Sequence, residues 1–185
     1  GNATAGGAYQ PGLSDYMVVV RNKTAMFLAG PPLLKAATGE VATEEELGGA
    51  AMHAQVAGTA EYLAENDADG IRQARDIVGM LGWDNIANSA SYAEPRFPID
   101  DILGLIPCDL RKPYDVRSII ACLVDDSNFL DFKTEFDNQT VCGWASIGNV
   151  TIGIIGNNGP ITPQGAAKAS QFIQLCDQTG RPLLF

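Results

Sequence analysis

The stretch of sequence that decides the fold is residues 141–185, VCGWASIGNVTIGIIGNNGPITPQGAAKASQFIQLCDQTGRPLLF. Two apolar runs rich in β-branched residues, 141–147 and 150–155, predict two buried strands. The dipeptide Gly148-Asn149 between them suits a tight two-residue turn. The two runs therefore predict an antiparallel hairpin.

A helix signal follows the hairpin. Thr162 and Pro163 have the pattern of an N-cap residue followed by a first-turn proline, and they predict a helix that continues to Gln178. Pro182 then begins another strand. The residues expected on the buried face of the helix are Ala166, Ala169, Phe172, Ile173 and Cys176. The order strand, strand, helix, strand predicts a ββα repeat of an α/β fold.

The first half of the chain shows part of the same pattern, because a glycine-rich loop with no element before it is followed by two strands and then by helices. The predicted strands are residues 16–20 and 25–28, and the predicted helices are residues 33–37, 44–48 and 67–81. Thr43 and Glu46 have the spacing of a capping box at the start of the second helix. The residues expected on the core face of the third helix are Ile71, Ala74, Ile77, Val78 and Leu81.

Residues 84–98 separate the two halves. They are polar, carry two prolines and lack periodicity, so they predict an interdomain linker. Beyond them, residues 115–123 predict a helix. The spacing of Phe129, Phe132 and Phe136 predicts a second short helix that packs on the core.

Composition excludes several classes of function. The formal net charge of -10 leaves no basic footprint for nucleic acid. The acidic cluster at residues 44–46 is interpreted as a solvated helix start. The sequence contains no run of about 18 consecutive apolar residues, so it predicts no membrane-spanning helix. His53 is the only histidine, so no site can draw two histidines from this chain.

The four cysteines, Cys108, Cys122, Cys142 and Cys176, are widely spaced and form no CxxC pair. Three of them lie in apolar stretches, which predicts buried thiols in a reducing compartment rather than disulfides or zinc ligands. Both ends of the chain, a Gly/Ala-rich turn and an apolar strand, have the character of a protein interior. The chain is therefore expected to be a piece of a longer protein that does not fold alone.

The pentapeptide Ala5-Gly6-Gly7-Ala8-Tyr9 is the most informative motif. Adjacent glycines allow a sharp turn and let a ligand approach the backbone N–H groups closely. Such N–H groups can stabilise a developing oxyanion without any side chain. Taken alone, the pair of glycines favours an ordinary turn over a binding site.

The surrounding segments give the motif its meaning, because in order and spacing they resemble the β-subunit carboxyltransferases of propionyl-CoA, methylcrotonyl-CoA and geranyl-CoA carboxylases. The resemblance covers essentially the whole chain. Besides residues 5–9, the segments that carry it are Pro11, Ser14-Asp15, residues 27–40 (FLAGPPLLKAATGE), residues 45–50 (EELGGA), His53, Gly58, Tyr114-Asp115-Val116-Arg117, Ile120-Ala121, Phe129, Phe132-Lys133, residues 156–159 (GNNG), residues 172–176 (FIQLC) and residues 182–185 (PLLF).

The resemblance implies a crotonase-like (ClpP/crotonase) α/β fold, a ββα superhelix, with parts of two related domains. Residues 1–83 would be the C-terminal part of the N-terminal carboxyltransferase domain, and residues 84–104 the interdomain linker. Residues 105–185 would be the N-terminal part of the C-terminal domain. The active site would lie between the N-terminal domain of one subunit and the C-terminal domain of another.

The resemblance also implies site residues. Gly6 and Gly7 match a backbone oxyanion hole that holds the enolate of the acyl-CoA while it attacks CO2 delivered by carboxybiotin. The residues implied on the acyl-CoA side are Ala8, Tyr9, Gly12 and Lys35. The residues implied on the biotin side of the cleft are Asn157, Asn158 and Gly159. No metal is implied in this subunit. The alternatives are core packing for Tyr9, a solvated helix lysine for Lys35, and loop shaping for the two asparagines.

Partners follow from the same resemblance. Biotin would be carried by a biotin carboxylase/carboxyl carrier α subunit, and the β subunits would form a homo-oligomer, expected to be a hexamer. No nucleic acid or membrane partner is implied. The implied location is the cytoplasm of a bacterium or, in a eukaryote, the mitochondrial matrix.

Three details favour geranyl-CoA over methylcrotonyl-CoA as the substrate: Gln10-Pro11-Gly12-Leu13 after the glycine loop, Tyr16 after Asp15, and residues 159–165 (GPITPQG). Several rivals stay open, namely a propionyl-/acetyl-CoA carboxylase β subunit, a biotin-dependent decarboxylase and, more remotely, an enoyl-CoA hydratase or isomerase. A scaffold subunit without chemistry is the rival that is not an enzyme. Ser14, Asp15 and His53 form a tempting trio, but a turn and a packed helix residue are the preferred interpretation.

Overall fold

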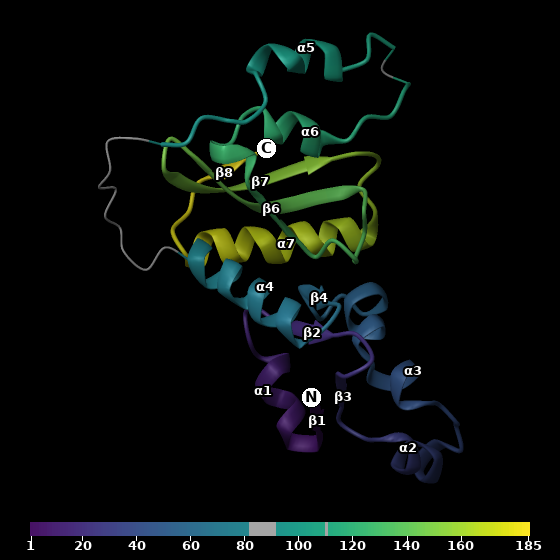
Figure 1. The fold of residues 1–185 in the computed structure, drawn as a ribbon. Coiled ribbons are helices and arrows are strands. Elements are labelled where there is room, and N and C mark those ends of the chain that lie inside the picture. The colour runs from purple at the N-terminus through teal and green to yellow at the C-terminus, as the bar shows by residue number, and fades with distance from the viewer. Residues whose placement is uncertain (82–91, 110) are drawn as a thin grey trace. The chain divides into compact units, whose positions relative to one another are not determined.

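The structure is a computed structural model that describes residues 1–81, 92–109 and 111–185. The chain forms two compact units, which are described separately (Figure 1). Unit 1 consists of Gly1–Arg75 together with the short segment Lys133–Phe136. Unit 2 consists of Asp76–Phe132 and Asp137–Phe185.

Two pairs of short parallel strands organise unit 1. Strand β1 (Asn2–Thr4) pairs with β3 (Ala25–Phe27), and β2 (Val18–Val20) pairs with β4 (Tyr62–Ala64). The two strands predicted here are confirmed as β2 and β3. The expectation that no element precedes the glycine loop is wrong, because Asn2–Thr4 satisfies its backbone groups by pairing with β3.

Short helices lie between these strands. They are η1 (Ala5–Ala8, 3₁₀), α1 (Tyr9–Gly12), α2 (Pro31–Thr38), α3 (Glu44–Gly48) and η2 (Met52–Val56, a π-helix). The longer helix α4 (Asp67–Met80) follows β4, and its residues from Asp76 on are counted in unit 2. The capping box of α3 is confirmed: the Thr43 side chain accepts from the Glu46 N–H, and the Glu46 carboxylate accepts from the Thr43 N–H at 2.8 Å. Thus α3 begins where its sequence signal lies.

The helix predicted at residues 67–81 is confirmed as α4, but its predicted core face is confirmed only in part. Ile77 is buried as predicted, whereas Ile71 and Val78 are 64% and 53% exposed. The helix turns Gly70 towards the sheet of β2 and β4, where a Cβ on Gly70 would lie 3.5 Å from Val20. This is an ordinary contact distance, so Gly70 marks the side of the helix that faces β2 and β4.

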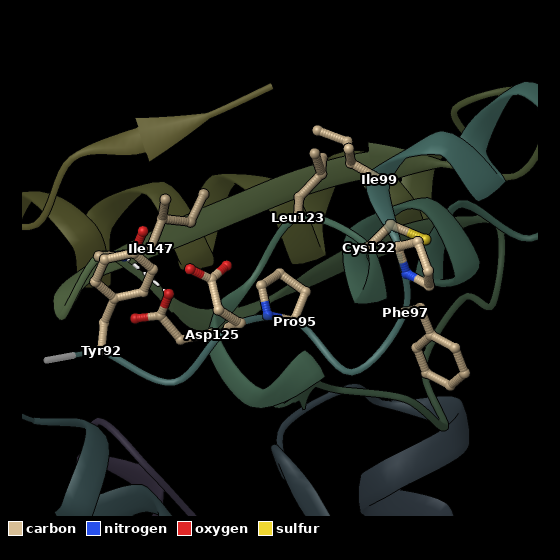
Figure 2. Close-up of a pocket in the computed structure, with 11 residues that line it drawn as sticks. Tyr92, Pro95, Phe97, Ile99, Cys122, Leu123, Asp125 and Ile147 are labelled. Atoms are coloured by element: carbon tan, nitrogen blue, oxygen red, sulfur yellow. Dashed lines mark hydrogen bonds between the residues drawn. The ribbon is translucent and has the colours of Figure 1, made fainter.

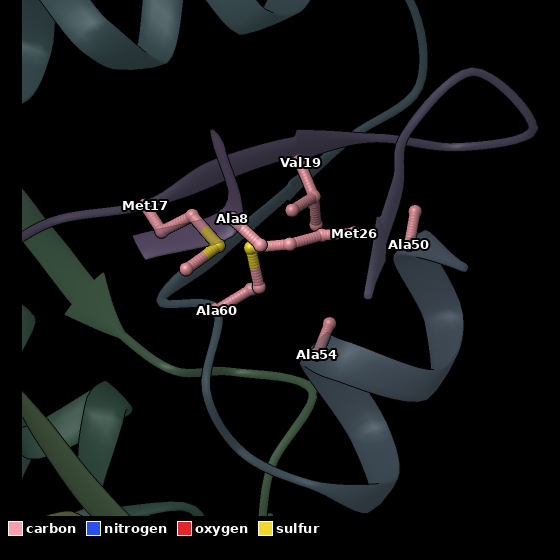
Figure 3. Packing of buried hydrophobic residues seen from close by; sticks show 7 residues of the cluster. All are labelled: Ala8, Met17, Val19, Met26, Ala50, Ala54 and Ala60. Carbon is pink, nitrogen blue, oxygen red and sulfur yellow. The ribbon is translucent and has the colours of Figure 1, made fainter. Parts of the chain in front are cut away.

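The core of unit 1 is built from small and flexible side chains (Figure 3). Met17, at the entrance to β2, and Met26, in β3, point towards each other, with Ala8 between them in the view. The buried members of this cluster are Ala8, Met17, Val19, Met26, Ala50, Ala54 and Ala60. Methionine fills irregular gaps well, so a core made of alanines can still pack closely around it.

A four-stranded sheet forms the centre of unit 2. Its strands are β5 (Phe129–Phe132), β6 (Thr140–Ile147), β7 (Val150–Asn157) and β8 (Leu183–Leu184), in the order β5-β6-β7-β8. The predicted hairpin is confirmed, because β6 and β7 pair antiparallel around Gly148 and Asn149, with φ of 59° and 65°. Strand β8 pairs parallel with β7 after helix α7 (Pro163–Gln178), which completes the predicted ββα order.

Both faces of this sheet are covered, which explains the continuous apolar run of β6. On one face, the ring of Phe172 in α7 lies 5.2 Å from Phe132 and 4.8 Å from Trp144. On the other, Val141 and Ala145 share a cluster with Ile120 of helix α6 (Val116–Ala121). The remaining short helices of unit 2 are η3 (Ile99–Asp101), α5 (Ile102–Leu105) and η4 (Asp125–Ser127).

Two predictions for unit 2 are wrong. Phe129 and Phe132 do not start a helix, since they form strand β5 against β6, and Lys133 ends the strand with a φ of 52°. The buried face of α7 carries Gly165, Lys168, Phe172, Leu175 and Cys176, while Ile173 is exposed. Sheet pairing in the first case and a buried lysine in the second override the local pattern.

The cysteines follow the sequence prediction. Cys122, Cys142 and Cys176 are buried and free, and Cys108 is free and exposed. Burial raises the pKa of the Cys142 thiol to about 12 and that of Cys176 to about 11. These two thiols are therefore unreactive packing groups. Among the described residues, none of the helices combines the length and the apolar character that crossing a membrane requires.

Candidate functional site

The glycine loop of unit 1 directly follows β1. Ala5 starts the loop with a left-handed φ of 49°, and helix η1 follows at once. Gly6 and Gly7 are exposed, and a Cβ added to either would meet no atom within 4 Å. Ala8 is buried in the core of unit 1 and so anchors the C-terminal end of the glycine pair. The sequence thus produces a turn with a fixed base and an open outer surface.

The backbone N–H groups of this loop differ in their availability. Helix η1 has its N-cap at Thr4, so the i to i+3 pattern of a 3₁₀-helix directs the Gly7 N–H to the Thr4 carbonyl. The N–H of Gly6 lies before the first such bond and has no acceptor within the helix. An exposed N–H at the start of a helical turn is a suitable donor for an anionic oxygen.

The other residues implied on the acyl-CoA side also lie in unit 1. Tyr9 is 59% exposed. Gly12 ends α1 and borders open space. Lys35 is exposed in the last turn of α2. Tyr9 and Gly12 both lie in α1, which begins one residue after the glycine pair, whereas Lys35 comes from a separate helix.

The trio Ser14, Asp15 and His53 does not form a catalytic triad. His53 Nε2 lies 2.8 Å from the carbonyl oxygen of Met26, which can only accept, so Nε2 carries a proton. Its Nδ1 lies 2.6 Å from the hydroxyl of Thr59. Ser14 donates to the Gln10 carbonyl at 2.8 Å. The interpretation of His53 as a packed helix residue is confirmed.

A buried ion pair in unit 1 was not predicted from the sequence. Lys133 and Glu61 are 5% and 4% exposed, and the Lys133 Nζ lies 3.4 Å from Glu61 Oε1. Burial lowers the pKa of Lys133, and the nearby Glu61 carboxylate opposes that shift. Lys133 and Glu61 are 72 positions apart in the sequence, so no local sequence pattern indicates the pair.

The end of β7 and the loop after it hold the residues implied on the biotin side, and they belong to unit 2. The Asn158 side chain accepts from the Val116 N–H at 2.8 Å and donates to Asp115 at 3.1 Å. The Asn158 N–H donates to the Gln139 carbonyl at 2.7 Å. Asn157 is exposed and donates to the Gly159 carbonyl at 2.9 Å. Asn158 therefore ties the loop to the start of α6.

A polar hollow of about 470 Å³ opens beside this loop. Its lining residues are Pro113, Tyr114, Asp115, Arg117, Asn138, Gln139 and Asn158. Arg117 also donates to Asp131 at 2.8 Å and 3.0 Å, and this hydrogen bonding to Asp131 raises the pKa of Arg117. The hollow thus combines amide groups, a phenol and a guanidinium held in place by a carboxylate.

A second hollow of unit 2, also of about 470 Å³, involves part of the predicted linker (Figure 2). In the view, Tyr92, Asp125 and Ile147 lie at one end, and Phe97 and Cys122 lie at the other. The Asp125 carboxylate accepts from the N–H groups of Gly148 and Asn149 at 2.9 Å and 2.8 Å, so it is committed to the β6–β7 turn.

The predicted linker is only partly described, because residues 84–91 lie outside the described residues. In the described part, Arg96 forms an ion pair with Asp126 at 2.6 Å, and the Arg96 N–H donates to Ser127. This segment packs on η4 in unit 2. Among the described residues, no three His, Cys, Asp or Glu side chains gather in a way that could hold a metal ion.

Comparison with known proteins agrees with this fold. The whole chain, residues 1–185, matches the model of the carboxyl transferase domain. It is 65% identical to the β subunit of P. aeruginosa geranyl-CoA carboxylase, over 100% of this chain and 35% of that one, with a TM-score of 0.51.

Two further proteins are similar over almost the whole chain. A probable biotin-dependent acyl-coenzyme A carboxylase beta2 subunit of Mycobacterium tuberculosis is 45% identical over 100% of this chain and 35% of the relative. The transcarboxylase 12S structure, described as a hexamer assembly, is 31% identical with a TM-score of 0.87, over 99% of this chain and 37% of that one. The chain therefore spans about a third of the length of these proteins.

Proposed function

Because the chain belongs to the carboxyl transferase domain family and has its crotonase-like fold, we propose that its protein is the carboxyltransferase component of a biotin-dependent acyl-CoA carboxylase. The reaction would transfer CO2 from carboxybiotin to an acyl-CoA. The observation that carries this proposal is the glycine loop, since Gly6 and Gly7 are exposed over a buried anchor and no atom would lie within 4 Å of an added Cβ.

The loop would act on the acyl-CoA by stabilising negative charge. Loss of a proton next to a thioester places charge on the thioester oxygen. The N–H groups at Gly6 and Gly7 would hold that oxygen, with Gly6 as the donor that has no competing acceptor within η1. Such donors are already oriented before the reaction, so little reorganisation is needed when the charge develops.

The remaining residues of the acyl-CoA side would shape and anchor the substrate. Ala8 fixes the base of the loop in the core. The exposed ring of Tyr9 would form a wall of the acyl pocket, and Gly12 would leave room for the chain. Lys35, exposed at the end of α2, would contact a phosphate of coenzyme A through its ammonium group.

Biotin would be bound through unit 2. The group itself would be brought by a partner and would supply CO2. Its ureido ring needs hydrogen-bonding groups of the amide type, and the polar hollow beside Asn157, Asn158 and Gly159 offers side chains of that chemistry at Asn138 and Gln139. Asn158 would hold the loop in place, and the exposed Asn157 would face the ligand.

We also propose the partners and the location that the family resemblance implies. An α subunit would carry biotin, and the β subunits would form a homo-oligomer, expected to be a hexamer. The transcarboxylase relative, described as a hexamer assembly, supports this expectation. The location would be the cytoplasm of a bacterium or the mitochondrial matrix of a eukaryote.

Geranyl-CoA is the proposed substrate, ahead of methylcrotonyl-CoA. The 65% identity with a geranyl-CoA carboxylase β subunit supports it, as does the small residue Gly12 near the proposed acyl pocket. A β-methyl unsaturated thioester can lose a γ-proton and delocalise the charge onto the thioester oxygen, so the same N–H groups would serve. Hydrophobic pockets discriminate by only about 1–3 kcal/mol per methylene, so some activity on both substrates is expected.

The test is kcat/KM of the complete complex on geranyl-, methylcrotonyl- and propionyl-CoA. We expect the largest value for geranyl-CoA. A preference for propionyl-CoA would refute the branched substrate and leave the carboxyltransferase proposal intact. Absence of biotin-dependent carboxylation of all three would refute both.

A further inference from the structure

The segment Lys133–Phe136 belongs to unit 1, although it follows strand β5 of unit 2 in the sequence. Lys133 donates a hydrogen bond to the Gly58 carbonyl and pairs with Glu61 at 3.4 Å. The Phe136 ring lies against Gly58, where a Cβ would come within 2.7 Å of ring carbons. Gln55 donates to Glu135 at 2.8 Å. The segment is therefore a packed part of unit 1 and not a passing loop.

Glu61 connects this segment to the backbone of the core. Its Oε2 accepts from the Met17 N–H at 2.6 Å, while Oε1 faces Lys133. The Met17 carbonyl accepts from the N–H groups of Glu61 and Tyr62 at 3.1 Å each. Both backbone groups of Met17 are thus fixed by residues 61 and 62, at the entrance to β2.

Met17 in turn shares the core of unit 1 with the residue that anchors the glycine loop. Its side chain belongs to the same buried cluster as Ala8, the residue that directly follows Gly6 and Gly7 (Figure 3). Interiors are close-packed, so a shift of Met17 would be transmitted to Ala8. A continuous set of contacts therefore leads from Lys133 through Glu61 and Met17 to the anchor of the loop.

We infer that Lys133 and Glu61 are a positioning pair, which holds the glycine loop in its active geometry by balancing the buried carboxylate that fixes Met17. This inference rests on the proposed function, because the active geometry is the one in which the loop N–H groups hold the thioester oxygen. Without Lys133, Glu61 would be a buried charge without its cation, and water or a movement of the β2 entrance would have to compensate. Buried ion pairs often add little net stability, so geometry is the property expected to depend on this one.

The test uses the complete protein with Lys133→Met, the double variant Lys133→Met/Glu61→Gln, and the control Lys23→Met. Glutamine keeps an oxygen that can accept from the Met17 N–H but needs no cation. Lys23 forms an exposed ion pair with Asp67 at 2.7 Å in the same unit, so the control removes the same charge without touching the core. The readouts are kcat and KM for the acyl-CoA, and amide hydrogen exchange of residues 6–9 by mass spectrometry.

We expect Lys133→Met to lower kcat about tenfold or more with little change in KM, and to speed exchange at residues 6–9, because small misplacements of reacting groups are costly. The double variant should return kcat to within about threefold of the wild type and restore slow exchange, and Lys23→Met should change neither. A double variant as impaired as the single one, or unchanged exchange in Lys133→Met, would overturn the inference. If Lys133→Met does not fold, a folded and active double variant supports the pair, and an unfolded one overturns it.

The proposed function and the positioning pair can be refuted independently of each other. Exchange at residues 6–9 is measured without turnover, so it reports on the pair even if the wild type carboxylates no acyl-CoA. An inactive wild type whose loop still loosens in Lys133→Met would refute the proposed function and retain the structural part of the pair.

Discussion

Two glycine-containing loops follow strands in this molecule, and they use their glycines in opposite ways. In the loop after β1, a Cβ on Gly6 or Gly7 would meet nothing within 4 Å. In the loop after β7, a Cβ on Gly159 would lie 2.1 Å from Gln139 Oε1, and near the end of β7 one on Gly156 would lie 3.1 Å from Val116. The first pair keeps space free in front of the backbone, whereas the second lets the protein's own side chains approach. Glycine alone therefore does not identify a ligand site.

The strongest test of this contrast is Gly7→Val in the complete enzyme. The added side chain would occupy the space in front of the loop, so kcat should fall by roughly 100-fold or more, the effect of losing one oxyanion donor. The fold should remain intact, because nothing lies within 4 Å to clash. Steady-state kinetics and circular dichroism would be measured together.

Gly79→Val is the matched control for this variant, since Gly79 lies in α4 and also borders open space. Its kcat should equal that of the wild type. An unchanged kcat in correctly folded Gly7→Val would mean that the free space at the first loop is not used by the substrate.

A moderate effect is expected from Asn158→Ala in the second loop. The change leaves the Val116 N–H without its acceptor and removes a hydrogen bond to Asp115, so unit 2 should lose about 1–2 kcal/mol. Denaturant unfolding, with hydrogen exchange of residues 116–121, would measure it. Asn157→Ala is the matched control, because Asn157 is exposed and makes one bond within its own loop. Equal stabilities of the two variants would contradict the anchoring role of Asn158.

The smallest expected effect is a pH dependence of the stability of unit 2, through Asp115 beside the second loop. Burial raises the pKa of Asp115, but hydrogen bonds from the Arg117 N–H and the Asn158 amide outweigh burial and lower it below 3.8. A folded-state pKa below the unfolded value contributes stability above about pH 4, and this contribution is lost as the pH falls through the folded pKa. Denaturant midpoints between pH 5 and pH 3 should fall less in Asp115→Asn than in the wild type. Parallel curves for the two proteins would show that Asp115 makes no such contribution.

Predictions that rest on local chemistry were the most successful. The capping box of Thr43 and Glu46, the Gly148-Asn149 turn and the Thr162-Pro163 helix start all satisfy backbone groups within a few residues. Neighbouring residues alone decide such features, so the sequence is sufficient. The order of the ββα unit followed from them.

Predictions that needed a neighbour far along the chain were less successful. The spacing of Phe129, Phe132 and Phe136 fits a helix, yet pairing with β6 makes the first two part of a strand. The apolar residues of α4 predict one core face, but Ile71 and Val78 are exposed, and Gly70 faces β2 and β4. In both cases contact with another element outweighs a weak local preference.

For the candidate site, the sequence by itself indicated the residues and the chemistry, because a pair of glycines in a known order of segments is a local and specific pattern. The sequence also excluded any site that needs two histidines from this chain, because His53 is its only histidine. Only the tertiary structure decided which loop is open, that Asn158 is committed to α6, and that Lys133 meets Glu61 in the core of unit 1. Exposure, hydrogen-bond commitment and the partner of a buried charge depend on residues that folding brings together from distant parts of the chain.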